Sequence, residues 1–337
     1  MVLGLKFPEK GVILCSSDTQ EVTMRHYFAP LEGLTDSIYR RLHQKYFPGI
    51  DRYYMPFISP TMHHSFTTKE KRDLPEAGSV PFVAIPQILT KSPEDFLWAA
   101  GCCKDLGYEQ VNLNMGCPSG TVVSKGKGAG MLQNLDTLRA FLDAVFSATP
   151  VAISVKTRIG MSSPEEFPAI LALLEQYPNM ELTIHPRVRQ AFYKGNVDLD
   201  AFAYAMTHSA IPLCYNGDLC SQEDIDAIAA RFPQLQAVMI GRGLIGCPGM
   251  LCPGGIDRAK LTQFHDELME EYCITFGNRR NAMCRMKENW RHLLCLFEGG
   301  EALGKKLRKT TDYDGYLSVT REILTGLPLR DKLQPDW

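Results

Sequence analysis

The feature that most constrains the fold is a repeated alternation of short apolar strands with helical segments. Eight strands are expected, at residues 25–30, 51–57, 80–87, 109–114, 151–156, 181–185, 211–215 and 237–240. They are almost continuously apolar, as expected when helices cover both faces of a parallel sheet. Eight such units in roughly 220 residues predict an α/β protein with a closed (β/α)8 TIM barrel.

The alternative with the same alternation is an open, doubly wound sheet. That fold usually carries G-x-G-x-x-G after its first strand, and no such run follows residues 25–30. Cap residues mark three of the expected helices. Thr35 precedes one, and Ser92-Pro93 and Ser163-Pro164 each place a cap before a first-turn proline.

The pattern changes after the eighth strand. Residues 247–255 are rich in turn formers, and the chain beyond them has helical periodicity. We therefore expect an N-terminal extension (residues 1–23), a barrel domain (24–250) and a C-terminal all-α helical domain (256–337).

Composition limits the classes of function. The 337 residues carry a net charge of −2 with a pI of about 6.5, so nucleic acid could bind only at a local basic patch. Eleven cysteines are scattered along the chain without paired C-x-x-C motifs, which favours reduced thiols over disulfides or a metal site. The N-terminus has no apolar stretch long enough to target or span a membrane. We expect a cytoplasmic protein, and no obligate protein partner is indicated.

The stretch 111–132 has the strongest chemical signal. Its apolar strand stops at Asn114, and Cys117 stands between Gly116 and Pro118. Pro118 has no N–H and cannot continue a β ladder, so the cysteine belongs to a loop at the strand end. A buried structural cysteine is the alternative. Loops held on rigid strands often carry function, which favours a chemical role for Cys117.

Other strands also end in polar residues, at the edge where barrel enzymes place their chemistry. Asn216-Gly217-Asp218 and Gly241-Arg242 follow the last two strands, where glycine backbone, an arginine and a following helix suit a phosphate. Lys156 closes an apolar strand and needs an anionic or electron-rich partner. A reduced flavin supplies such a partner, and Gln87 could reach the edge of its ring.

Six motifs stand at these strand ends in order: APLEGLTD, NLNMGCPS, SVKTRIG, TIHPR, YNGD and MIGRG. With them the chain, from about Arg25 to Gly246, resembles the FMN-dependent tRNA-dihydrouridine synthase family. The resemblance implies an FMN-binding barrel and a helical domain that helps to hold tRNA. Pro186 departs from the family pattern, in which a small residue often follows the histidine, and this leaves the roles of Arg187 and Arg189 open.

The resemblance also implies a role for particular residues. Cys117 would be the catalytic acid, and Asn114 would lie near the uracil and the flavin. NADPH or NADH would reduce FMN, whose N5 would give hydride to C6 of a uridine while Cys117 gives a proton to C5. The residues expected around FMN are Pro30, Leu31, Glu32, Gln87, Lys156, His185, Asn216, Gly217, Asp218, Gly241 and Arg242.

Basic residues gather in the tail. Residues 279–309 hold nine Lys and Arg against three Glu, a local charge of 9 − 3 = +6 that favours phosphate binding over a merely solvated helix face. The expected RNA-binding residues are Lys125, Lys127, Arg279, Arg280, Arg285, Lys287, Arg291, Lys305, Lys306, Arg308 and Lys309. Two alternatives remain: an FMN barrel oxidoreductase acting on a small molecule such as a dihydropyrimidine, and an RNA-binding factor without catalysis.

Overall fold

The computed structural model of the chain describes residues 24–178 and 180–336. The predicted N-terminal extension, residues 1–23, lies outside the described residues. The sheet contains parallel strands only. In chain order they are β1 (Arg25–Phe28), β2 (Arg52–Tyr54), β3 (Ala84–Ile85), β4 (Gln87–Ile88), β5 (Gln110–Met115), β6 (Ala152–Arg158), β7 (Leu182–His185), β8 (Leu213–Tyr215) and β9 (Ala237–Ile240).

The sheet closes into a barrel because β3 and β4 are two halves of one strand. Pro86 separates them, since it has no N–H for the ladder, but its carbonyl still accepts from the N–H of Asn112 at 2.8 Å. The first half pairs with β2 and the second with β5, while β1 pairs with β9. Eight strand positions therefore form a ring, which confirms the predicted TIM barrel.

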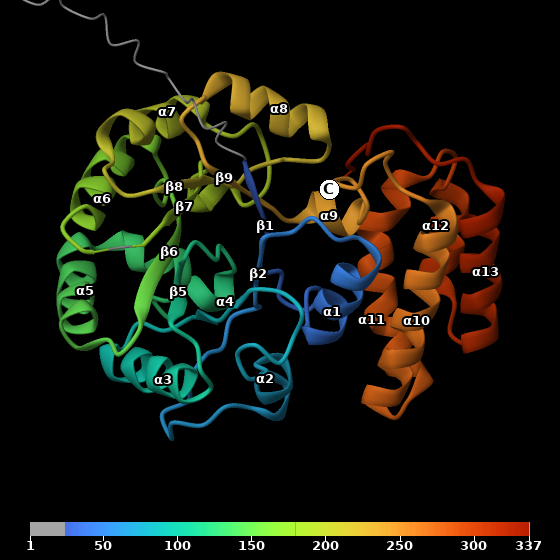
Figure 1. Cartoon of the computed structure of the whole chain (residues 1–337), viewed down its shortest axis with the longest axis horizontal. Coiled ribbons are helices and arrows are strands. Elements are labelled where there is room, and N and C mark those ends of the chain that lie inside the picture. The colour runs from blue at the N-terminus through green and yellow to red at the C-terminus, as the bar shows by residue number, and fades with distance from the viewer. Residues whose placement is uncertain (1–23, 179, 337) are drawn as a thin grey trace, which may run out of the picture.

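Helices surround this ring (Figure 1). They are α1 (Ser37–Tyr46), α2 (Thr68–Asp73), α3 (Pro93–Asp105), α5 (Leu135–Ala148), α6 (Phe167–Leu174), α7 (Leu199–His208) and α8 (Gln222–Arg231). Two short helices, α4 (Gly120–Val123) and α9 (Arg242–Gly246), follow β5 and β9. Ser92 caps α3 as predicted, because its hydroxyl accepts from the N–H of Asp95 at 3.1 Å.

The predicted cap of α1 was wrong by one residue. Asp36 caps this helix, with Oδ1 accepting from the N–H of Tyr39 at 3.0 Å. The hydroxyl of Thr35 instead accepts from the N–H of Leu31 at 2.9 Å and closes the loop before the helix. Both residue types are good caps, and the loop decides between them. Ser163 does cap a helical segment as predicted, but its first turn (Pro164–Glu166) is a 3-10 helix, and α6 follows it directly from Phe167.

Strand side chains alternate between two apolar layers, which is why the sequence shows no alternation. Tyr27, Tyr54 and Met239 belong to the cluster inside the barrel, whereas Phe28 and Tyr53 belong to the larger cluster between barrel and helices. Both layers exclude water, so both need apolar residues.

The C-terminal helices α10 (Arg258–Phe276), α11 (Arg279–Leu293), α12 (Glu301–Lys309) and α13 (Tyr313–Gly326) form a group, here called the helical group, beside α1 and α9 (Figure 1). The Phe264 ring packs edge-on against Tyr39 and Phe47, each at 5.4 Å between centroids. The hydroxyl of Tyr272 donates to Asp36 Oδ1 at 3.1 Å. Among the described residues, no helix is long and apolar enough to cross a membrane.

Candidate active site

A single cavity at the carboxyl ends of the strands gathers every residue that the sequence predicted for catalysis or cofactor binding. The lining includes Pro30, Leu31, Glu32, Gln87, Asn114, Cys117, Lys156, His185, Asn216, Gly217, Asp218, Gly241 and Arg242. Phe57, Arg158, Tyr193 and Met239 also line it, and none of them was among the predicted catalytic or cofactor-binding residues.

The loop after β5 holds Cys117 through the side chain of Asn114. Asn114 Oδ1 accepts from the N–H of Gly116 at 3.1 Å and from the N–H of Cys117 at 2.9 Å. On its other side the loop packs closely. Gly128 has φ +56, and a Cβ there would lie 3.0 Å from the Cβ of Cys117. Glycine is therefore required at 128 both for its backbone conformation and for space.

A chain of buried amides anchors Asn114 in turn. Its Nδ2 donates to Gln87 Oε1 at 2.7 Å, and Gln87 Nε2 donates to Asn112 Oδ1 at 2.7 Å. Asn112 Nδ2 then donates to the hydroxyl of Ser154 at 2.9 Å. These side chains come from β4, β5 and β6, so the barrel itself fixes the position of the cysteine loop.

The Cys117 thiol is held in its protonated form. Burial raises the pKa of this thiol above its ordinary value, and this effect outweighs a backbone hydrogen bond from Ser119 and the positive charges of Arg158 and Lys156, which lower it. A thiol with a raised pKa is a proton donor at neutral pH rather than a thiolate nucleophile.

Positive charge collects in the same cavity as the thiol. Burial lowers the pKa of Lys156 to about 8, with a further contribution from the charge of Arg158. Burial also lowers the pKa of His185 well below its usual value, and the neighbouring cations add to this, so the imidazole is neutral. A neutral imidazole and an ammonium group with a lowered pKa can both contact an electron-rich ring.

Arg158 stands at a predicted strand end, in the motif SVKTRIG, but the sequence prediction gave it no role in the site. It is 1% exposed, its Nε donates to the carbonyl of Gly116 at 2.9 Å, and its Nη1 donates to the carbonyl of Val188 at 3.1 Å. It thus fastens the cysteine loop to the loop after β7. The period of two along a strand places residues 156 and 158 on the same face, and this signal could have identified it.

The loops after β7, β8 and β9 meet around two arginines. Arg187 forms an ion pair with Asp218, and Arg242 Nη2 lies 3.2 Å from Asp218 Oδ1. Asp218 has φ +47, an uncommon backbone conformation outside glycine. Arg187 Nε is buried without a hydrogen-bond partner among the described atoms. The region is rich in cationic donors for an anion.

Glycines bring these loops into close contact. A Cβ on Gly243 would lie 2.1 Å from the carbonyl oxygen of Leu219, and one on Gly217 would lie 2.7 Å from Val197 Cγ1. Any other residue would push the loops apart. The N-terminus of α9, predicted to help bind a phosphate, can contribute little to such binding, because α9 has only five residues. The donors that remain at this point are backbone N–H groups and arginine side chains.

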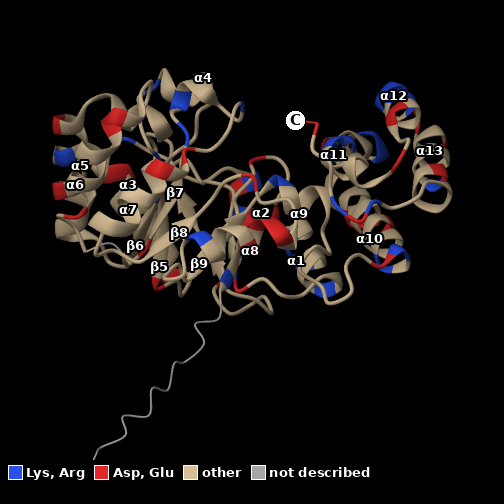
Figure 2. Ribbon diagram, turned by 90° about the horizontal axis from the view of Figure 1, so that it is seen from above, with Lys and Arg blue, Asp and Glu red and all other residues tan. Residues whose placement is uncertain are grey.

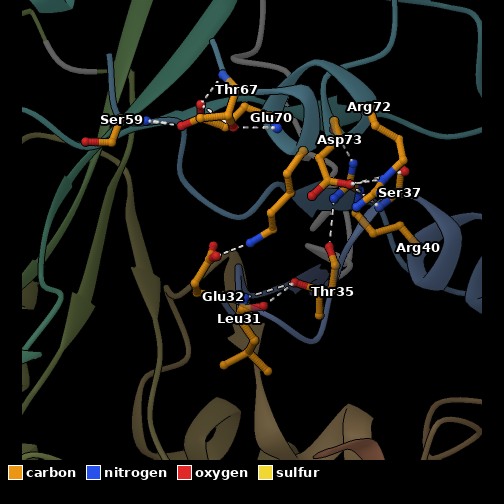
Figure 3. A network of polar contacts seen from close by, with 11 residues as sticks. Leu31, Glu32, Thr35, Ser37, Arg40, Ser59, Thr67, Glu70, Arg72 and Asp73 are labelled. Carbon is orange, nitrogen blue, oxygen red and sulfur yellow. Dashed lines mark hydrogen bonds and ion pairs between the residues drawn. The ribbon is translucent and has the colours of Figure 1, made fainter. Parts of the chain in front are cut away.

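The opposite wall, formed by the loop after β1, is braced by α2 (Figure 3). Arg40 is buried and donates to the carbonyls of Thr35 and Asp73, both at 2.7 Å. Lys69 forms an ion pair with Glu32, which lines the cavity. This wall is therefore tied to a separate helix rather than left as a free loop.

The predicted RNA-binding residues do not all present free ammonium or guanidinium groups. Lys125, Arg279, Arg280, Arg291, Lys305, Lys306, Arg308 and Lys309 are exposed, whereas Lys127, Arg285 and Lys287 are half-buried. Lys287 Nζ donates to the carbonyl of Thr310 at 2.5 Å, so this side chain helps to join α11 to the turn after α12. In Figure 2, α4 on the barrel and α12 in the helical group both lie at the upper edge and both have basic residues nearby.

Comparison with known proteins places this chain in a family. The model of the family described as dihydrouridine synthase (Dus) matches residues 27–313. The tRNA-dihydrouridine synthase B of Pasteurella multocida (strain Pm70) is 30% identical over 225 residues, which cover 66% of this chain and 67% of the relative. A protein of the same name from Shewanella oneidensis is 29% identical over 221 residues, 65% of this chain and 67% of the relative. A probable tRNA-dihydrouridine synthase of Rhizobium leguminosarum bv. phaseoli is 28% identical over 228 residues, which are 67% of this chain and 70% of the relative.

Proposed function

The chain belongs to the dihydrouridine synthase family, and from this premise we propose that it reduces the C5–C6 double bond of uridines in tRNA with a flavin, FMN, and with NADPH as the reductant. The observation that carries the proposal is the cavity, in which a protonated thiol and a set of cationic and amide side chains line one space. An acid on one side and an electron-rich cofactor on the other are what reduction of a pyrimidine double bond requires.

The chemistry of the lining residues supports a flavin. Arg242 and the tightly packed glycines after β8 and β9 suit the phosphate, and the unpartnered Nε of buried Arg187 points to a missing acceptor in the same region. Lys156, His185 and Gln87 would contact the ring system. When bound, the reduced flavin supplies the hydride for C6 of the uracil ring.

Cys117 supplies the second half of the reduction. As hydride arrives at C6, negative charge develops at C5, and the thiol gives its proton to that carbon. The product is dihydrouridine, and the thiolate left behind recovers a proton from solvent. Asn114 and Arg158 act on the backbone of residues 116 and 117, so their role is to hold the sulfur in position.

We assign tRNA binding to the exposed basic residues of the helical group and of the loop after α4. A uridine in folded RNA must leave its stack to reach the cavity, at a cost of a few kcal/mol that contacts elsewhere must offset. The exposed arginines and lysines of α11 and α12 can provide phosphate contacts for this.

The decisive experiment compares wild-type protein with Cys117→Ala. Both should bind FMN, and NADPH should reduce the flavin in both. Only the wild-type protein should then form dihydrouridine in unmodified tRNA, because the variant cannot protonate C5. Free uridine and other small pyrimidines serve as competing substrates. Wild-type turnover of the small molecules but not of tRNA would contradict the proposal, as would full activity of Cys117→Ala on tRNA.

A further inference from the structure

The segment after β2 forms a surface feature beside the cavity that the proposed function leaves unused. Phe57 lines the cavity, and Ile58 pairs with Ile88 on the barrel. The N–H of Ser59 then donates to Glu70 Oε1 at 2.7 Å, and its hydroxyl donates to the carbonyl of Leu89 at 3.1 Å (Figure 3 shows Ser59 and Glu70). The start of this segment is therefore fixed to the rim of the barrel.

Beyond this anchor the segment presents an aromatic surface. The His64 imidazole stacks on the Trp98 ring, with 5.1 Å between centroids and 7° between planes, and Phe66 packs on Trp98 at 4.7 Å. His64 Nε2 lies 3.4 Å from Asp95 Oδ1. One face of the imidazole is thus covered, yet the side chain remains 44% exposed, so the outer face is open to solvent.

The backbone at His64 is held in an unfavourable conformation. Its φ is +49, in the left-handed region that costs free energy for residues with a Cβ. In addition Met62, two residues earlier, is 86% exposed. Such backbone outliers cluster at sites that contact ligands, so this one is a reason to consider a binding role for the segment.

Three lysines lie near Asp95, the carboxylate beside the imidazole. Burial lowers the pKa of Lys127, and the charges of Asp95, Lys125 and Lys91 also act on it. Lys127 Nζ donates to the hydroxyl of Ser59 at 3.1 Å, and a Cβ on Gly126 would lie 3.8 Å from Lys91 Nζ. Lys91 and Lys125 are exposed, and neither forms an ion pair with a carboxylate in the part of the chain that the structure describes. The carboxylate of Glu70 is already used by the backbone of Ser59 and Thr67. The surface is therefore aromatic and cationic at once.

This surface is continuous with the loop that carries the reacting thiol. Lys127 directly precedes Gly128, which packs against Cys117, and the N–H of Ala129 donates to the carbonyl of Cys117 at 3.1 Å. Lys127, bonded to Ser59, therefore links the segment that bears His64 to the loop from which Cys117 reaches into the cavity.

We propose that His64, stacked on Trp98 and beside the Asp95 carboxylate near which Lys91, Lys125 and Lys127 gather, binds an unpaired nucleotide of the RNA substrate next to the reduced uridine. The base stacks on the open face of the imidazole, and its phosphate lies among these lysines. An aromatic face with neighbouring cations is the combination that binds single-stranded nucleic acid, whereas a duplex keeps its base faces covered. The inference rests on the proposed function, because it needs RNA at the cavity.

The test measures RNA binding by the FMN-loaded protein directly. His64→Asn removes the ring but tolerates the left-handed backbone, and His64→Tyr restores an aromatic face. His63→Asn is the matched control, because His63 is an exposed neighbour on the same segment. A thermal melt and the absorbance of bound flavin verify that each variant folds.

We expect His64→Asn to raise the Kd for tRNA and for single-stranded oligouridine by about tenfold, within the range for the loss of one stacked base. His64→Tyr should recover the affinity, His63→Asn should match the wild type, and Kd for duplex RNA should not respond. Lys91→Gln with Lys125→Gln should lower the dependence of log K on log salt by about one to two.

Equal tRNA affinity for His64→Asn and the wild type, or an equal loss with His63→Asn, would overturn the inference while leaving the proposed function intact. A loss for duplex RNA as large as that for oligouridine would also overturn it, because stacking would not be the cause. Failure of the proposed function would give a different result, because the wild-type protein itself would then neither bind tRNA nor form dihydrouridine.

Discussion

Replacing Asn114 with alanine should separate loop positioning from the chemistry of the thiol. The side chain makes three hydrogen bonds, to the N–H groups of Gly116 and Cys117 and to Gln87 Oε1, at 2.7 to 3.1 Å. At about 1 kcal/mol for each, their loss lowers the free energy of unfolding by about 3 kcal/mol. Freeing the loop also displaces the sulfur, and a shift of about 1 Å can reduce kcat about 100-fold.

The assays are urea unfolding and single-turnover reduction of tRNA after the flavin has been reduced. Asn134→Ala is the matched control, because Asn134 Oδ1 also accepts a backbone N–H, from Thr137 at 2.9 Å, but only caps α5. It should lose about 1 kcal/mol and keep its rate on tRNA. Asn114→Asp keeps both backbone acceptors, so it should recover more of the stability than alanine does.

Two results would refute this reasoning. If Asn114→Ala were no less stable than Asn134→Ala, the bonds to Gly116 and Cys117 would not be holding the loop. If stability fell as expected while kcat on tRNA stayed within about threefold, the loop position would not matter for proton transfer.

The remaining predictions concern packing, proton linkage and charge. Gly243→Ala should lower the free energy of unfolding in urea by more than about 2 kcal/mol, because its Cβ would lie 2.1 Å from a carbonyl oxygen. Gly101→Ala, which has open space around it within α3, should instead raise that free energy by about 0.5–1 kcal/mol. Equal effects of the two substitutions would contradict the close packing at Gly243. The pKa of Lys156 is lowered to about 8 in the free protein, and a bound anion favours the charged form of this side chain. FMN affinity, measured by fluorescence, should therefore fall as pH rises above 8. Lys156→Met should remove this pH dependence. Lys305→Glu should weaken tRNA binding and lower the slope of log K against log salt concentration by about one to two. Lys104→Glu, the same charge change on α3, should do neither. Similar slopes for the two variants would exclude specific contacts by α12.

The sequence predicted most of the barrel because each strand is a local feature. Both faces of every strand are buried, so each appears as a short apolar run, and each polar strand end follows directly in the chain. The parallel arrangement then brings all these ends to one edge. That is why residues as far apart as Pro30 and Arg242, both predicted from strand ends, line one cavity.

Where two local choices are equally good, the sequence could not decide. Thr35 and Asp36 are both favourable caps, and the hydrogen bond from Leu31 to Thr35 settles which one begins α1. The role of Arg158 could not be predicted either, because nothing near it in the chain shows that its partners are the carbonyls of Gly116 and Val188.

The sequence alone thus determined the barrel, the loop that bears Cys117 and the set of polar strand ends, because these follow from runs of neighbouring residues. Only the tertiary structure decided which of those groups are already engaged. Lys287 is bound to a carbonyl, Asn114 is committed to the cysteine loop, and His64 meets Trp98 across 34 positions of chain. Such pairings depend on distance in space, and hydrogen-bond and ring partners far apart in the chain leave no periodic pattern to read.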